Sequence, residues 1–282
     1  MSTDHSAARW RRYLDAVNFD EAPRPLRAAF EFAFVALRRF IAIEGAQQAT
    51  LLGAQAFTSL IPLMVVAAAA SPGSEDLADR IVERFGLQGD SAESMQQLFA
   101  SAGTTRSTIT WISIVILMLS ALSFTRALQR VFQRAYARKP DMIKDQQRGL
   151  AWLVCLGIWV TLLSPLHESL EDLGGIVFAV LVATVSGFLL WLGTPMLLLG
   201  ERDWRFLAPG ALVSGFLGAL LGVASSIYVP IAMDWSAEKY GLIGIAFALQ
   251  SWLLVAGFVI VIGAVIGATV VERVAAFRGA HG

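Results

Sequence analysis

The chain has 282 residues, a formal net charge of zero, 56% apolar residues and only 16% charged residues. Soluble domains carry about 25% charged residues, and the mean hydropathy here is +0.62. These values exclude an ordinary soluble domain and favour an integral membrane protein.

Six apolar stretches follow one another along the chain. They cover residues 45–70, 108–125, 150–166, 175–199, 208–230 and 242–271. A helix that spans a bilayer needs about 20 such residues, so each stretch reaches or nearly reaches that length. The pattern predicts an all-α fold, a polytopic bundle of six transmembrane helices spanning residues 45–272, with a tail at 273–282.

The basic residues alternate between the segments that separate these stretches. Eighteen of the 22 lysines and arginines fall in the first, third, fifth and seventh hydrophilic segments, whereas the intervening segments hold only Arg80, Arg84, Arg106 and Lys239. The positive-inside rule relates such alternation to topology. It predicts that both termini are cytoplasmic.

Residues 1–44 form a basic segment that contains one amphipathic pattern. Apolar side chains recur at steps of three and four at Leu26, Phe30, Phe34, Leu37 and Ile41. This spacing predicts a helix on the cytoplasmic leaflet, with Pro23 and Pro25 near its start. The helix either packs under the bundle or contacts lipid.

Residues 71–107 form the one sizeable segment on the outer side. Glu75 and Asp76 open a first amphipathic pattern, Gly86 and Gly89 interrupt it, and a second pattern follows. The segment is too short to bury a core of its own. We therefore expect two short helices that cap the outer face of the bundle.

Small residues predict how the spans pack, because membrane helices approach one another where side chains are small. The fifth stretch repeats small residues every four positions, at Gly210, Ser214, Gly218, Gly222 and Ser226. The sixth places Ala246, Gln250, Gly257, Ala264 and Ala268 on one face. These faces can serve helix packing within the chain or the assembly of an oligomer.

The first span is the least lipid-like. Its polar side chains gather on one face, which comprises Glu44, Gln48, Gln55, Ser59 and Pro62. Polar groups within a bilayer favour a functional site, and proline is expected to kink the helix and free a carbonyl. The stripe either lines a substrate pathway, which Gln250 would also face, or makes hydrogen bonds between helices.

The second span ends in an arginine ridge that contains Arg126, Arg130 and Arg134. Such arginines often set topology by reaching the lipid headgroups. The alternative is recognition of an anionic lipid headgroup or another anion.

The sequence offers little for catalysis. Its three histidines are His5, His167 and His281, and no metal-ligand cluster, phosphate-binding loop or nucleophile motif is present. We expect no enzyme activity, no cofactor and no nucleic-acid partner.

Four short passages, taken in order, resemble the YihY/BrkB family of bacterial inner-membrane proteins across residues 30–272. They are Ser59-Leu60-Ile61-Pro62, the arginine-rich segment 123–136, Trp204-Arg205 with the following Pro209-Gly210-Ala211, and Tyr240-Gly241 followed by Gly244, Trp252 and Gly263-Ala264. The resemblance implies six spans, cytoplasmic termini and a link to virulence or to lipid and envelope transport. It also implies a glutamate where this chain has Val265. An older ribonuclease label finds no support in these residues.

The sequence thus predicts a transporter or a translocase of lipids or other anionic amphiphiles. Its pathway would lie beside the polar face of the first span, and Arg126 and Arg130 would attract a headgroup. A membrane scaffold or assembly factor is the alternative.

Overall fold

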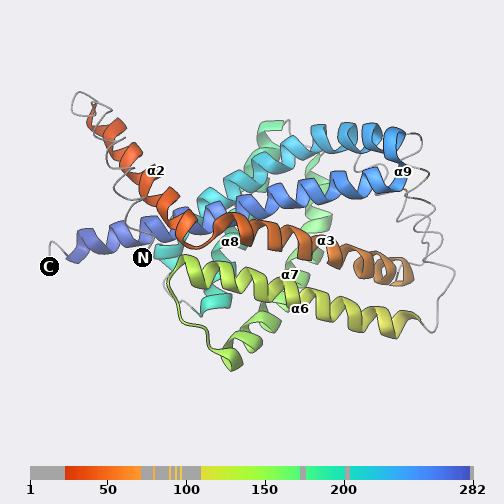
Figure 1. Cartoon of the computed structure of the whole chain (residues 1–282), viewed down its shortest axis with the longest axis horizontal. Coiled ribbons are helices and arrows are strands. Elements are labelled where there is room, and N and C mark those ends of the chain that lie inside the picture. The colour runs from red at the N-terminus through yellow and green to blue at the C-terminus, as the bar shows by residue number, and fades with distance from the viewer. Residues whose placement is uncertain are drawn as a thin grey trace, which may run out of the picture.

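The computed structural model describes residues 23–70, 109–171, 176–200 and 204–279, together with Asp79, Gly89, Glu93 and Gln96. All regular structure in these residues is helical, which confirms the all-α prediction (Figure 1). The helices are α2 (Arg24–Ala42), α3 (Gly45–Ala70), α6 (Ile109–Ala135), α7 (Met142–Glu171), α8 (Ile176–Leu199) and α9 (Trp204–Gly279).

Helix α9 consists of two arms that fold back on each other at Gly241. This glycine has φ 59° and ψ −143°, a conformation that residues with a side chain rarely adopt. Close to the turn, Gly244 lies directly against the backbone carbonyl of Ser236. The two arms therefore form a hairpin whose turn depends on glycine at both positions.

Within the described residues, three segments are long and apolar enough to cross a membrane. They are Val115–Ala135, Leu207–Ser236 and Ile243–Val274, and a shorter apolar segment covers Thr184–Leu199. Each predicted span lies almost entirely within a helix. The membrane character of the chain is thus supported by three long apolar helices, whereas the count of six spans stays a prediction.

Helices α3 and α6 and the two arms of α9 run lengthwise, whereas α7 and α8 cross behind them (Figure 1). The two arms of α9 contact α3 and α8 most extensively, and α3 also packs along α6. A buried cluster that includes Leu52, Leu128, Val131, Leu198 and Val261 joins these helices.

The backbones approach one another at glycines. Gly53 of α3 packs on Leu254 of α9, and one α-helical turn away Gly257 of α9 packs on Ala49. A side chain at either glycine would collide with the backbone of the neighbouring helix, so this close approach requires glycine.

Two more glycine contacts hold the arms of α9 in place. Gly210 lies against Gly267 and joins the two arms, whereas Gly215 lies against Gly187 of α8. The predicted packing face of the fifth stretch is confirmed at Gly210, which contacts the other arm of α9. The predicted face of the sixth stretch is confirmed at Gly257, which contacts α3.

The other end of the fifth stretch corrects the sequence-based prediction. A side chain added at Gly218 or Gly222 would meet no atom of the described residues within 4 Å, and Ser226 is exposed. A row of residues four apart turns by about 40° per step around a helix, so the row leaves the contact made by Gly210. Gly215, outside the predicted row, makes the contact with α8 instead.

The N-terminal amphipathic helix is confirmed as α2, which follows Pro23 and has Pro25 in its first turn. One face packs on α9, where the rings of Phe40 and Phe258 stack with centroids 6.3 Å apart. The predicted apolar stripe is the neighbouring face, and Leu37 and Ile41 on it are exposed. The helix thus packs against the bundle while it leaves an apolar stripe uncovered.

The predicted outer cap at 71–107 lies outside the described residues except at four positions. Asp79, Glu93 and Gln96 are helical, and Gly89 forms a turn with φ 58°. The Gln96 amide donates a hydrogen bond of 2.8 Å to the Asp79 carboxylate.

The glycine contacts make a matched pair of substitutions on one helix. A Cβ at Gly215 would lie 2.6 Å from the backbone nitrogen of Phe188, whereas one at Gly218 would meet open space. We expect Gly215→Ala to lower the free energy of unfolding by about 1–3 kcal/mol through overpacking. Gly218→Ala should raise it by up to about 1 kcal/mol through helix propensity. Thermal melting in detergent measures both, and equal melting temperatures would contradict this packing.

Candidate functional site

Two glutamines of α3 present buried amide oxygens without a partner. Gln48 is 7% exposed, and Gln55 lies two turns further along the same face. The Oε1 atom of each is buried and accepts no hydrogen bond from any residue that the structure describes. A buried acceptor that stays unpaired costs about 1–3 kcal/mol, so these two atoms are the most unusual polar groups of the first predicted span.

The rest of the predicted stripe behaves differently. Ser59 donates its hydroxyl to the Gln55 backbone carbonyl at 2.8 Å, so its hydrogen bond is made within the helix. Helix α3 continues unbroken from Gly45 to Ala70 through Pro62, whose side chain lies outside the described residues. Gln250 is half-buried on α9.

Glu44 lies in the two-residue turn that joins α2 to α3. Its φ is 57°, a left-handed conformation that disfavours residues other than glycine, asparagine and aspartate. The Glu44 carboxylate accepts a hydrogen bond of 2.8 Å from Arg134 Nη1. The same guanidinium also contacts the Ile43 backbone carbonyl at 3.4 Å, so Arg134 ties α6 to this turn.

The arginine ridge does not meet the buried glutamines through any interaction recorded for the described residues. Arg126 is exposed and donates to the Gln146 side-chain oxygen of α7 at 2.7 Å. Arg130, one turn further on, is also exposed. Only Arg134 reaches the polar stripe, where it meets Glu44.

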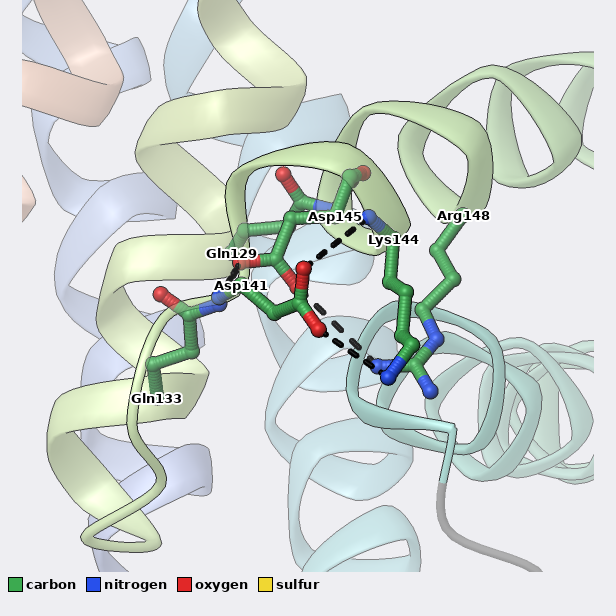
Figure 2. A network of polar contacts seen from close by, with 6 residues as sticks. All are labelled: Gln129, Gln133, Asp141, Lys144, Asp145 and Arg148. Atoms are coloured by element: carbon green, nitrogen blue, oxygen red, sulfur yellow. Dashed lines mark hydrogen bonds and ion pairs between the residues drawn. The ribbon is translucent and has the colours of Figure 1, made fainter.

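A polar network at the start of α7 was not predicted from the sequence (Figure 2). Asp145 is at its centre. Its Oδ2 accepts hydrogen bonds from Gln133 of α6 at 2.7 Å and from the Asp141 backbone N–H at 2.9 Å. Its backbone carbonyl accepts one from the buried Gln129 at 2.7 Å. The network joins the end of α6 to the first turn of α7.

Basic side chains surround the same turn. Lys144 Nζ lies 3.1 Å from Asp141 Oδ2, and Arg148 Nη1 lies 4.0 Å from Asp145 Oδ1. The bond to the Lys144 side chain, followed by that to its backbone N–H, lowers the pKa of Asp141. Because the folded pKa is lowered, Asp141 stabilises the fold above its ordinary pKa and loses this effect as pH falls through the lowered value. Asp141, which directly precedes α7, accepts a hydrogen bond of 3.4 Å from the Lys144 backbone N–H. Aspartate is a preferred N-cap residue, so Asp141 is the sequence signal that could have revealed this helix start.

A second unpredicted ion pair joins α2 to α9. Arg39 donates through Nη2 to the Glu272 carboxylate, and its Nη1 is buried without a partner among the residues described. Nearby, the Arg273 guanidinium lies 5.2 Å from the centre of the Phe32 ring. Arg39 and Glu272 are 233 positions apart in the sequence. No local sequence pattern therefore reveals their contact.

In the described part of the chain, no three His, Cys, Asp or Glu side chains gather as metal ligands. What the geometry offers is a polar face on α3, two ion pairs at the α2 end of the bundle and a hydrogen-bonded α6–α7 turn. These arrangements suit the binding of polar or charged groups.

The Asp145 network can be tested by removing its central acceptor. Asp145→Ala leaves Gln133 Nε2 and the Asp141 N–H without their acceptor, so we expect the free energy of unfolding to fall by about 1–3 kcal/mol. Gln147→Ala, at an exposed position of the same helix, should change it by less than about 0.5 kcal/mol. If both variants melt at the same temperature in detergent, the network does not stabilise the turn.

Comparison with known proteins places the chain in a family. Residues 36–281 match the Virulence factor BrkB family. No curated protein and no solved structure matches the chain. The match covers most of the chain and agrees with the resemblance of the four short passages. The chain belongs to the Virulence factor BrkB family.

Proposed function

We propose that this BrkB-family protein is a six-span transporter of the bacterial cytoplasmic membrane that moves a lipid or another anionic amphiphile. Its pathway follows the polar face of α3, and its arginines receive the headgroup at the cytoplasmic end. The single observation that carries the proposal is the pair of unpartnered amide oxygens on Gln48 and Gln55.

A packing role for these glutamines would leave their oxygens paired. Interhelical hydrogen bonds between side chains contribute about 0.6–2 kcal/mol each in membranes, and an unpaired buried acceptor forfeits this and adds a desolvation penalty. In a pathway, water or the hydroxyl and amine groups of a passing headgroup act as donors. Two such acceptors, two turns apart on one face, provide successive contacts along the helix.

The charged groups at the end of α6 support the anionic character of the substrate. Arg126 and Arg130 are exposed, and Arg134 lies beside the turn from which the polar face of α3 begins. Lysine and arginine near the membrane surface attract anionic headgroups at about 1 kcal/mol per charge. The basic alternation along the sequence orients this end toward the cytoplasm.

One observation favours a scaffold as the second candidate. Gly222 and Ser226 are exposed, and a Cβ at Gly218 would meet no atom within 4 Å in the part of the chain that the structure describes. A stripe of small residues suits close approach by another membrane helix. A second copy of the chain or another membrane protein could therefore pack there without any substrate being moved.

The pathway is tested by the double substitution Gln48→Leu with Gln55→Leu. Leucine is close to glutamine in volume, so the hydrogen-bonding groups disappear without a large cavity. In a deletion strain complemented with this variant, we expect normal protein abundance, an equal or higher melting temperature and loss of the rescued phenotype.

Gln47→Leu is the matched control, because Gln47 is exposed on the same turn of α3. It should rescue the strain fully. Full rescue by the double variant would defeat the pathway, whereas loss of rescue together with loss of the folded protein would favour the scaffold. Arg126→Gln should mimic the double variant, and Arg126→Lys should partly restore rescue.

The six-span topology is tested by single cysteines introduced into a Cys155→Ser background. A cysteine in place of Asp90 should react with an impermeant thiol reagent added to intact spheroplasts. One in place of Lys144, on the basic α6–α7 connection, should react only after the membrane is opened. Equal labelling at both positions in intact spheroplasts would rule out this topology.

A further inference from the structure

Arg39 is a half-buried cation that uses only part of its hydrogen-bonding capacity. Its side chain is 16% exposed, and its Nη2 donates to Glu272. Its Nη1 is buried and has no partner within the described ranges. A guanidinium presents a planar fork that matches two oxygens of one carboxylate or phosphate. Arg39 therefore binds the Glu272 carboxylate through Nη2, while Nη1 makes no hydrogen bond to a described residue.

Glu272 covers this cation from the solvent side. Its side chain is 63% exposed, so water already solvates much of the carboxylate. Leaving the ion pair costs the exposed acid little, whereas a buried guanidinium without any anion is strongly disfavoured. Arg39 thus requires an anion, and that anion can be exchanged.

The surroundings of Arg39 hold other cations and a neutral phenol. Arg273 follows Glu272 in the chain and lies against Phe32 of α2. Burial raises the pKa of Tyr136 to about 12, although the nearby Arg39 charge acts in the opposite direction. Tyr136 is therefore a neutral group at physiological pH and does not compete with an anion for Arg39. Glu44, the acid of the neighbouring turn, is paired with Arg134.

Two observations support a position of Arg39 near the membrane surface. Glu272 lies two residues before the end of the apolar segment Ile243–Val274. The neighbouring face of α2 exposes an apolar stripe with Leu37 and Ile41, as expected for a helix lying at the boundary between hydrocarbon and headgroups.

We propose that Arg39 is an exchangeable anion site, in which a phosphate-bearing anion displaces the Glu272 carboxylate and binds both Nη atoms. The phosphate belongs to a lipid headgroup or is free in the cytoplasm. This inference rests on the proposed function, since it names the headgroup class that the transporter receives. It is tested by binding alone, so its failure is distinguishable from a failure of the pathway along α3.

The experiment titrates the full chain in a non-ionic detergent and measures affinity together with the melting temperature. The probes are dioctanoyl phosphatidylglycerol, inorganic phosphate and dioctanoylglycerol, which has the same acyl chains without a phosphate. We expect phosphatidylglycerol to bind and dioctanoylglycerol not to bind. Saturable binding of inorganic phosphate at the same site would identify free phosphate as a ligand as well. Equal binding of dioctanoylglycerol would overturn the proposal.

Substitutions at the two partners should act in opposite directions. Arg39→Gln should weaken phosphatidylglycerol binding by about 10-fold or more, because it removes a charge-assisted bidentate contact. Glu272→Gln should strengthen it by about 3–10-fold, because the internal competitor is neutralised. Both variants should melt at a lower temperature than the unsubstituted chain, and saturating ligand should restore only Glu272→Gln.

Two controls separate this site from general charge effects. Arg27→Gln removes one positive charge at an exposed position of α2, and Glu238→Gln removes one negative charge at an exposed position of α9. Each should change the affinity by less than about two-fold, since exposed charges are screened. Glu272→Gln that binds no tighter than Glu238→Gln would overturn the proposal, as would Arg39→Gln that binds as well as Arg27→Gln.

Discussion

The close approach of α3 to α9 is the contact on which the other features depend. Apolar side chains gain little by leaving lipid for protein, so membrane helices associate where their backbones can touch. Gly53 and Gly257 allow this on opposite sides of one interface. The contact fixes the rotation of α3 about its axis. It thereby buries Gln48, which directly precedes Ala49, the residue that packs on Gly257 of α9. The buried amide oxygens of Gln48 and Gln55 are therefore held inside the bundle by glycine packing, because no hydrogen bond to a described residue holds them there.

The same contact positions the charged end of the bundle. With α3 held on α9, the short turn at Ile43 and Glu44 directs α2 onto the second arm of α9, where Phe40 stacks on Phe258. Glu44 adopts a left-handed conformation in this turn. Its carboxylate forms an ion pair with Arg134 of α6. An exposed ion pair contributes at most about 1 kcal/mol, comparable to the strain of one such backbone conformation. The turn is thus kept by the packing on either side of it.

Patterns of single helices were predictable from the sequence, whereas contacts between distant helices were not. The periodicity of Leu26, Phe30 and Phe34 and the flanking prolines predicted α2, and the polar spacing of α3 singled out Gln48 and Gln55. The predicted packing row makes contacts at Gly210 and Ser214, but the prediction was wrong at Gly218 and Gly222. A four-residue repeat rotates around the helix, and no sequence signal shows how far along the row the neighbouring helix stays in contact. Arg39 and Glu272 meet only through the tertiary fold. The start of α7 was predictable, because Asp141 directly before the helix is a preferred N-cap residue.

Val265 is an apolar residue in the centre of the bundle, at a position where the family resemblance implies a charged one. The resemblance to the family implies a glutamate at this position, yet the Val265 side chain is 2% exposed and belongs to the buried cluster with Leu128 and Val131. A carboxylate there would be neutral or would need a cation, because an unpaired buried charge is strongly disfavoured. The buried polar side chains in the described part of the chain are all neutral, and they are Gln48, Thr125, Gln129, Thr194, Ser214 and Thr269. The charges that do meet, Arg39 with Glu272 and Arg134 with Glu44, lie at the α2 end. Under the proposed transport function, the negative charge of a substrate would be recognised at that end, and the neutral amides would contact polar groups that pass along α3.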